Sequence, residues 1–200
     1  MQPVIAMIPV IEQVPIPAEH SPHLHPFPSY LGVLVLMSTG FVLATLIYAV
    51  RDGRVLMMYR HKEPNQGLWI APGGKILPNE SPRECAIREL CEETGLEAVE
   101  PVLRMVVTEV SPRPDWRWLL FVYRTGVKEG AVRGDGREGR LQWFRQDEVL
   151  SLPIPEADAV FYPFVMDPEC PPLEMQFWYD ADLKLVRWTR HALLGEWFRD

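Results

Sequence analysis

Hydrophobic residues in the first third of the chain fall in two runs separated by a short polar break. Positions 41–50 are almost entirely apolar, Arg51-Asp52-Gly53 interrupts them, and positions 54–60 are again mostly apolar. An Asp-Gly pair between two such runs is typical of a tight β-hairpin turn. We therefore predict two antiparallel strands over 41–50 and 54–60.

The first run has a second interpretation, because the uncharged stretch extends back to residue 31. Residues 31–50 are long enough to cross a bilayer as a helix. No lysine or arginine precedes them, whereas a secretory signal begins with a positive segment. Residues 41–50 are also needed as the partner of the following strand. We favour the strand over the membrane helix and expect no membrane association.

Residues 1–36 differ in composition from the rest of the chain. They are rich in proline, contain no lysine or arginine, and show no period that could build a core. Such a segment is typical of a disordered extension. We predict a folded domain over 37–190 and a C-terminal tail over 191–200, with Met37 as an alternative biological start.

A helix is predicted between Ser81 and Gly95. Ser81 is a suitable N-cap, Pro82 fits the first helical position, and Glu84 stands where a capping-box glutamate reaches back to the cap. Gly95 is placed to end the helix. The residues expected to pack this helix onto a sheet are Ala86, Ile87 and Leu90.

The same helix carries a group of carboxylates. Glu89, Glu92 and Glu93 stand at positions i, i+3 and i+4 and therefore project from one face. Crowded carboxylates repel one another, and a bound Mg²⁺ or Mn²⁺ relieves that repulsion because hard cations prefer oxygen ligands. Pro72-Gly73-Gly74, just upstream, lets the backbone approach such an ion closely and offer a carbonyl oxygen.

Downstream of Gly95 the pattern is rich in strands. Strands are predicted over 102–110, 116–124, 141–144, 173–179 and 183–189, and a second helix over 155–164. The second of these strands places Trp116, Trp118, Leu120 and Val122 on one face. An aromatic stripe of this kind is usually core, and the alternative is that one or two rings line a pocket for a nucleobase.

Composition agrees with a single domain and narrows its partners. A chain of 200 residues with 48% hydrophobic residues can bury one substantial core. The net charge of −7, without a strongly basic patch, argues against duplex nucleic acid as a partner. The three cysteines, Cys85, Cys91 and Cys170, show no paired spacing and fit a reducing cytoplasm. Cys85 and Cys91 are expected to pack the helix.

The segment from Gly74 to Leu96 has the pattern G-x5-E-x7-R-E-L-x-E-E-x-G-L, which resembles the Nudix box at every specified position. The resemblance implies an α/β fold in which a mixed β-sheet lies between helices, and a metal-dependent hydrolase. It also implies a site in which the Gly73 carbonyl and the carboxylates of Glu89, Glu92 and Glu93 bind the metal. In this family, the arginine and glutamate that match Arg88 and Glu80 support the site, and Arg88 orients a box glutamate.

Two further residues are candidates for this site. Arg137-Glu138-Gly139 precedes Trp143-Phe144, and it looks like the loop in which MutT-type Nudix enzymes hold an extra metal-binding or base glutamate. Glu138 is therefore a candidate catalytic residue and metal ligand. Lys75 follows the glycine pair and is a candidate for binding phosphate.

The order of elements after the box resembles the oxidised-purine nucleoside triphosphatases of the Nudix superfamily. By that resemblance, Glu156 and Asp158 open a helix from which they could receive the N–H edge of a purine. The chain departs from the group in three places, with Ile70 near its purine-reading asparagine, Ile154 near its tryptophan, and Glu156 with Ala157 or Asp158 near its acidic pair.

These observations lead to three hypotheses. The first is hydrolysis of oxidised purine nucleoside triphosphates such as 8-oxo-dGTP to a monophosphate and pyrophosphate. The second is the same chemistry on another nucleoside diphosphate derivative, such as ADP-ribose, a dinucleoside polyphosphate or an RNA 5′ end. The third is a non-catalytic module that binds a nucleotide. In each case a nucleotide is the expected partner, and a cytoplasmic monomer or small homo-oligomer is the expected form.

Overall fold

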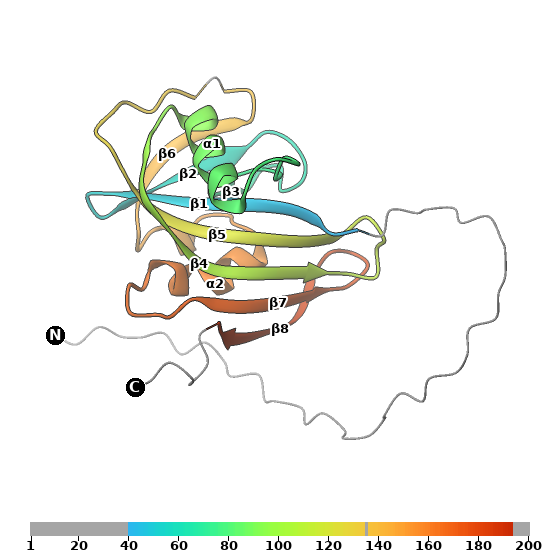
Figure 1. Cartoon of the computed structure of the whole chain (residues 1–200). Helices are drawn as coiled ribbons and strands as arrows, with labels where there is room; N and C mark the ends of the chain where they lie inside the picture. Colours follow the sequence, from blue (N-terminus) through green and yellow to red (C-terminus); the bar gives the residue numbers. More distant parts are fainter. Residues whose placement is uncertain (1–39, 135, 194–200) are drawn as a thin grey trace, which may run out of the picture. The chain divides into compact units, whose positions relative to one another are not determined.

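The structure is a computed structural model that describes residues 40–134 and 136–193 (Figure 1). The predicted extension 1–36, the alternative start at Met37 and most of the predicted tail lie outside the described residues. The described strands are β1 (Val42–Arg51), β2 (Arg54–Arg60), β3 (Trp69–Ile70), β4 (Ala98–Val110), β5 (Arg117–Val127), β6 (Gly139–Arg145), β7 (Leu173–Tyr179) and β8 (Leu185–Ala192). The described helices are α1 (Pro82–Thr94), the short 3-10 helix η1 (Val149–Ser151) and α2 (Glu156–Met166).

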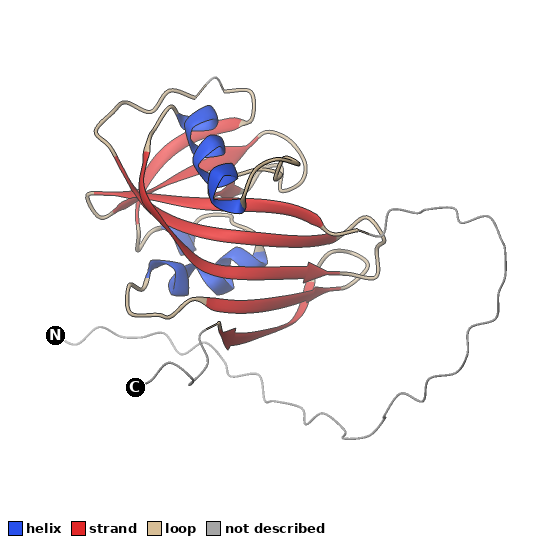
Figure 2. Cartoon of the chain, in the orientation of Figure 1, coloured by secondary structure: helices blue, strands red, loops and turns tan. Residues whose placement is uncertain are grey.

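The strands form one mixed sheet with the order β3-β2-β1-β5-β4-β7-β8, and β6 pairs with β2. β1 runs parallel to β5 over most of its length, and β4 runs parallel to β7. The helix α1 covers one face of the sheet and α2 covers the other (Figure 2). The predicted fold class, a mixed sheet between helices, is therefore confirmed.

The hairpin at the start of the domain is also confirmed. β1 and β2 pair antiparallel at Val50–Val55 and Arg51–Arg54. Asp52 and Gly53 both have positive φ, 51° and 71°, as a two-residue hairpin turn requires. Residues 42–50 thus form a strand, as favoured above, and no helix among the described residues is long and apolar enough to span a membrane.

Alternate residues of β1 belong to two different hydrophobic clusters. Ile47 and Ala49 pack with Leu90 beneath α1, whereas Tyr48 packs with Phe161 beneath α2. Successive strand residues point to opposite faces of a sheet, so one strand supports both layers. Since each fully buried large apolar side chain contributes roughly 1.5–3 kcal/mol, β1 is central to the stability of the domain.

The ends of α1 agree with the predicted caps. The Glu84 amide donates a hydrogen bond to Ser81 Oγ at 3.2 Å, and the Ser81 amide donates to Glu84 Oε2 at 2.8 Å. Gly95 ends the helix in the left-handed conformation with φ 71°. The capping box and the C-cap therefore fix where the helix begins and ends.

Two predictions for the packing of α1 are wrong. Ile87 is 37% exposed and Cys91 is exposed, although both were expected to pack against the sheet. They stand four residues apart and share a stripe of the helix that is turned away from the sheet. The buried stripe instead contains Ala86, Leu90 and Thr94, together with Cys85, whose sulfur lies 3.4 Å from Thr45 Oγ1.

The C-terminal elements follow the predicted order with one shift. β8 begins at Leu185 and not at the predicted residue 183, because Leu183 has a φ of 59° and belongs to the turn. The helix α2 begins after Pro155 as predicted. Its C-terminal end is held by Arg104 of β4, whose guanidinium donates to the carbonyls of Asp167 at 2.6 Å and Cys170 at 2.7 Å. β4 thereby fixes the position of α2.

Candidate active site

The glycine pair lies in a segment that runs alongside β1. The Thr45 amide donates to the Gly74 carbonyl at 2.9 Å, and the Ile47 amide donates to the Pro72 carbonyl at 2.8 Å. The Gly73 carbonyl, between these two, accepts no hydrogen bond from the described residues. A β-carbon at Gly73 would lie 2.0 Å from the Thr45 carbonyl oxygen, so this close approach requires glycine.

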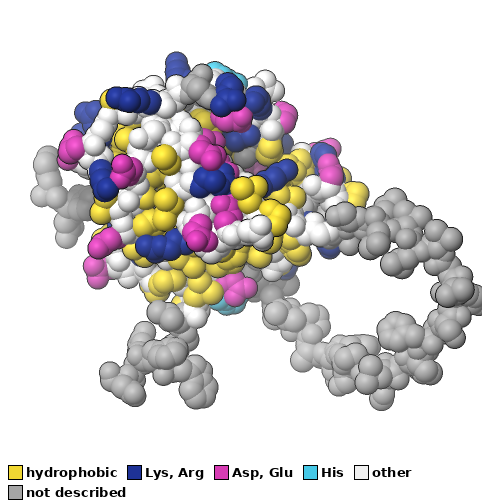
Figure 3. All heavy atoms as spheres, turned by 45° about the horizontal axis from the view of Figure 1, so that its top comes forward, with side chains coloured by type: hydrophobic (Ala, Val, Ile, Leu, Met, Phe, Trp, Pro, Cys, Tyr) yellow, Lys and Arg dark blue, Asp and Glu magenta, His cyan; other side chains and the backbone are white. Residues whose placement is uncertain are grey.

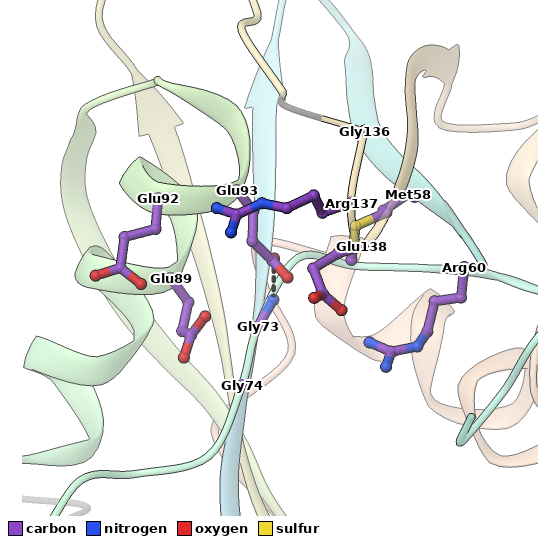
Figure 4. A pocket seen from close by; sticks show the side chains of 11 residues that line it. Met58, Arg60, Gly73, Gly74, Glu89, Glu92, Glu93, Gly136, Arg137 and Glu138 are labelled. Atoms are coloured by element: carbon purple, nitrogen blue, oxygen red, sulfur yellow. Dashed lines mark hydrogen bonds between the residues drawn. The ribbon is translucent and has the colours of Figure 1, made fainter. Parts of the chain in front are cut away.

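A cavity of about 350 Å³ opens beside this segment (Figure 4). It is lined from one side by Glu89, Glu92 and Glu93 of α1 and from another by the loop that carries Glu138. A β-carbon at Gly74 would lie 2.2 Å from Glu89 Oε1, so the second glycine makes room for this carboxylate. The structure therefore brings the four predicted glutamates and both glycines to one cavity.

Glu93 is a partly buried glutamate of this cavity. The Gly73 amide donates to Glu93 Oε2 at 2.9 Å and fixes the carboxylate against the loop. Burial raises the pKa of Glu93 to about 7, and the charges of Glu89 and Glu138 act in the same direction. The hydrogen bond from Gly73 and the positive charge of Arg60 oppose this rise. The cavity thus holds more negative charge than its own cations offset.

Arg88 joins the glutamates to one another. Its guanidinium donates to both oxygens of Glu80, at 2.9 and 2.6 Å, and to Glu89 Oε1 at 2.7 Å. A further hydrogen bond reaches Glu92 Oε2 at 3.1 Å. Hydrogen bonds from Arg88 lower the pKa of Glu80 to about 2. This geometry suits an orienting function for Arg88 and a supporting function for Glu80.

Glu138 lies across the cavity from α1. The backbone holds this position, because the His61 amide donates to the Glu138 carbonyl at 3.0 Å. The Glu138 carboxylate pairs with Lys62 at 2.9 Å, and both side chains are about half exposed. A partly solvated carboxylate opposite α1 can therefore turn toward either the lysine or the cavity.

The donor set of this cavity fits a divalent cation. The four carboxylates and the Gly73 carbonyl are hard oxygen ligands of the type that Mg²⁺ and Mn²⁺ prefer. Within residues 40–134 and 136–193, no three acidic, histidine or cysteine side chains already converge as a formed metal site. Arg88 instead binds Glu89 and Glu92. A cation would relieve the excess negative charge around the partly buried Glu93.

A second cavity, of about 520 Å³, adjoins the first and shares Arg60, Gly73 and Gly74 with it. Its walls include Trp116, Trp118 and Leu120, with the two indole rings 6.0 Å apart. The aromatic stripe therefore lines a cavity, as the alternative interpretation of the sequence proposed. The fourth residue of that stripe, Val122, is fully buried in the core.

The predicted substrate residues Lys75, Glu156 and Asp158 all line the second cavity. Asp158 is buried, and the Tyr48 hydroxyl donates to its Oδ2 at 3.3 Å. Glu156 is exposed, and its Oε2 accepts a hydrogen bond from the Leu185 amide at 2.6 Å. Lys75 follows the glycine pair in sequence, but it does not line the first cavity. We call that first cavity, which contains the four glutamates, the carboxylate cavity.

Arg60 and Glu109 are among the residues of these cavities that sequence reasoning did not single out. Arg60 lines both cavities, and nothing in the pattern of β2 marked its last residue as functional. Glu109 lines the second cavity and is buried. It follows the buried Met105 and Val107 at strand spacing, and a charged residue on the buried face of a strand is uncommon. A charged residue at the next position of the buried, alternating pattern of β4 was the sequence signal that could have identified Glu109.

The face of the molecule that Figure 3 draws carries charges of both signs. Acidic and basic side chains are interspersed there with apolar ones.

Several known proteins are similar to this chain in sequence. The chain is 33% identical to the uncharacterized Nudix hydrolase YvcI of Bacillus subtilis over 118 residues, 58% of this chain and 73% of that protein. It is 34% identical to the CTP pyrophosphohydrolase of Escherichia coli over 112 residues, 54% of this chain and 78% of that protein. It is also 34% identical to the putative 8-oxo-dGTP diphosphatase 3 of Mycobacterium tuberculosis, over 52% of this chain and 50% of that protein.

The fold and the family model lead to the same assignment. The crystal structure of the mutator MutT protein from Bacillus halodurans superposes with a TM-score of 0.67 and 30% identity, covering 75% of this chain and 97% of that chain. The NUDIX domain model matches residues 40–165, which include both cavities' contributions from β1, α1 and α2. The chain therefore belongs to the NUDIX domain family and is an enzyme of the Nudix hydrolase type.

Proposed function

We propose that this enzyme hydrolyses oxidised purine nucleoside triphosphates, such as 8-oxo-dGTP, to a nucleoside monophosphate and pyrophosphate. The observation that carries the proposal is the pair of adjoining cavities that share Arg60, Gly73 and Gly74. One is lined by carboxylates and suits metal-bound phosphates. The other is lined by tryptophans and carboxyls, and its volume lies in the usual range for small-molecule sites.

Arg60, Gly73 and Gly74, which line both cavities, suggest how a nucleotide is oriented across them. A base between the walls of the second cavity would place its phosphates toward Arg60 and the glycine pair. Arg60 carries a guanidinium suited to charge-assisted hydrogen bonds with phosphate oxygens. Lys75 supplies a second cation on the wall of the second cavity, which we call the base cavity because the proposal places the base there. These two cations would hold the triphosphate so that its phosphates enter the carboxylate cavity.

The chemistry is attack of water on phosphorus, with release of pyrophosphate. A divalent cation held by the Gly73 carbonyl, Glu89, Glu92, Glu93 and Glu138 would offset phosphate charge and lower the pKa of a bound water. The protein's part is to orient these ligands and to accept the proton of the water. Arg88 holds Glu89 and Glu92 in place, and Gly73 holds Glu93. Glu138, from the opposite loop, is placed either to complete the ligands or to take the proton.

A second candidate is hydrolysis of CTP or another nucleotide with a smaller base. The similarity to the E. coli CTP pyrophosphohydrolase favours it, since that similarity extends over 78% of that protein. The apolar Ile70 and Ile154 in the second cavity also leave fewer polar groups to read a purine. The chemistry at the carboxylate cavity would be the same.

We further propose that the enzyme acts on cytoplasmic nucleotides as a monomer or small homo-oligomer.

A substrate panel tests the proposal. Purified enzyme with Mg²⁺ or Mn²⁺ is given 8-oxo-dGTP, dGTP, CTP and ADP-ribose, and the products are separated. We expect the largest kcat/KM for 8-oxo-dGTP, with pyrophosphate and not free phosphate as the product. A larger value for CTP would support the second candidate, and absence of turnover on every compound would favour a non-catalytic module.

A further inference from the structure

Two buried carboxyl groups, on different elements of the fold, line the second cavity. Glu109 belongs to β4 and is 8% exposed, and Asp158 belongs to α2 and is 6% exposed. The Tyr179 hydroxyl lies 3.4 Å from Glu109 Oε1, and the Tyr48 hydroxyl lies 3.3 Å from Asp158 Oδ2. Each tyrosine reaches only one oxygen of its carboxyl, and these distances are long for hydrogen bonds between oxygens. A ligand in the cavity could therefore use the remaining oxygens.

The groups around this pair do not neutralise it. Neither carboxyl forms an ion pair within the described part of the chain. Tyr48 and Tyr179 contact the pair directly. The other charged groups on the walls of this cavity are Arg60, Glu63, Lys75, Glu156 and Lys184. None of the three cations among them is a cause of the pKa shift of either carboxyl. Tyrosines are neutral at physiological pH, and Glu156 adds negative charge. Simultaneous ionisation of Glu109 and Asp158 is therefore unfavourable.

The pair binds a proton more tightly than ordinary carboxyls do. Burial raises the pKa of Glu109 to about 7. Burial and, next, the charge of Glu109 raise the pKa of Asp158 to about 8. Two groups coupled in this way release their protons as a pair, so near neutral pH they hold about one proton between them.

We propose that Glu109 is a specificity-determining residue that works with Asp158 as a donor–acceptor pair and reads the edge of a 6-oxopurine base. This inference rests on the proposed function, in which the second cavity holds the base. The neutral carboxyl donates its O–H to the purine carbonyl, and the ionised carboxyl accepts the neighbouring N–H groups. Trp116, whose ring lies 6.3 Å from that of Tyr179, borders the base on the same side.

This pair of groups discriminates between bases by chemistry and not by size. An adenine-type edge presents an amino group where guanine presents a carbonyl, and it lacks the adjacent N–H. A buried carboxylate then stays unpaired, and a site built around hydrogen bonds rejects such analogues strongly. The pair selects oxo over amino purines whatever the state of C8, so it acts equally on dGTP and 8-oxo-dGTP.

The test compares two substitutions of Glu109 in the full-length enzyme. The measured quantity is the ratio of kcat/KM for dGTP to that for dATP, because the pH dependence of the carboxylate cavity cancels in this ratio. Glu109→Met keeps a similar shape and removes the hydrogen bonds, and we expect the ratio to fall about 10- to 100-fold, mainly through KM for dGTP. Glu174→Gln, an exposed change on β7, is the control and should leave the ratio unchanged.

The second substitution, Glu109→Gln, tests the shared proton. In the wild type the ratio should fall below about pH 7, where both carboxyls are neutral, and above about pH 8, where both are ionised. Glutamine is a permanent donor, so Glu109→Gln should keep the acidic fall and lose the alkaline one. The pH dependence of Glu109→Gln therefore tests the shared proton even if Glu109→Met fails to fold.

Two outcomes overturn the inference. One is an equal loss on dGTP and dATP in a folded Glu109→Met enzyme, which would make Glu109 structural. The other is an unchanged alkaline fall in Glu109→Gln. A wild-type preference for CTP or ADP-ribose is a different result, because it removes the proposed function before any variant of Glu109 is compared.

Discussion

The two cavities of this enzyme hold carboxyl groups in opposite ways. In the carboxylate cavity, Arg88 binds three glutamates, and the Gly73 amide binds a fourth. In the base cavity, the side-chain groups that donate hydrogen bonds to Glu109 and Asp158 within the described part of the chain are tyrosine hydroxyls. The first arrangement orients its carboxylates and raises the pKa of one of them, Glu93, whereas the second raises the pKa of both of its carboxyls. In the functions proposed above, carboxyl groups serve charge stabilisation in one cavity and hydrogen-bond recognition in the other.

The largest expected effect is at the carboxylate cavity. Because Glu93 should hold a cation that stabilises charge in the transition state, Glu93→Gln should lower kcat by on the order of 10² or more. The loss should be the same for every base, and the thermal unfolding temperature should change little. Steady-state kinetics at saturating Mg²⁺ measure it.

Glu84→Gln is the matched control, since Glu84 lies on the same helix and contributes to its cap. Its rate should stay close to that of the wild type. Near-normal turnover of Glu93→Gln would remove the carboxylate cavity from the mechanism.

Arg60 tests the connection between the cavities. Arg60→Met should lower kcat/KM by about 10- to 100-fold for all nucleoside triphosphates, because hydrogen bonds to charged groups contribute about 1.5–3 kcal/mol. The preference among bases should not change. Arg145→Met, an exposed arginine paired with Asp147, is the control. A loss confined to one base would instead place Arg60 in base recognition.

The proton of the base cavity predicts a pH-dependent stability. The pKa values of Glu109 and Asp158 are raised above their usual range, so the folded enzyme binds these protons more tightly than the unfolded chain. The stability that they contribute is present below about pH 4 and is lost as the pH rises through about 7 and 8. Glu93, whose pKa is also raised to about 7, contributes to the loss in the same pH range. Denaturant unfolding of the wild type should show a loss of about 1–3 kcal/mol between about pH 6 and pH 9, and a variant of Asp158 separates the share of the base cavity.

Asp158→Asn should reduce this loss, because asparagine does not ionise. Asp147→Asn is the control, since the exposed Asp147 has a pKa lowered by Arg145 and does not titrate in that range. A wild-type stability that is flat with pH would show that the two carboxyls are ionised in the folded state.

The smallest expected effect is at the rim of the carboxylate cavity. Lys62 pairs with Glu138, and both are about half exposed. Exposed ion pairs contribute at most about 1 kcal/mol, so Lys62→Ala should change kcat by no more than about fivefold. A loss as large as that of Glu93→Gln would show that the lysine itself binds phosphate.

The two cavities also differ in how far the sequence predicted them. The carboxylate cavity comes mainly from residues 73–93, where caps, glycines and helical spacing fix the geometry locally, and Glu138 was placed by a motif. The packing of α1 was predicted less well, because the stripe with Ile87 and Cys91 is set by the angle at which the helix meets the sheet. That angle depends on contacts with distant strands.

The base cavity could be predicted only in part. Trp116, Trp118 and Asp158 were candidates because they stand in a stripe or near a motif. Glu109 became a candidate only once the fold showed β4, α2 and β7 together, since Asp158 and Tyr179 lie far from it in sequence. A site whose residues are far apart in sequence can be predicted only when the order of the strands in the sheet is known. Local sequence patterns do not give that order.

The most direct test of this division between the cavities is a crossed measurement. The kcat and KM for dGTP and dATP are determined for the wild type, Glu93→Gln and Glu109→Met. We predict that Glu93→Gln lowers kcat equally for both nucleotides and keeps their ratio, whereas Glu109→Met changes the ratio and keeps kcat for dATP. If both variants lower both activities in the same proportion, the two cavities do not have separate functions and the account is contradicted.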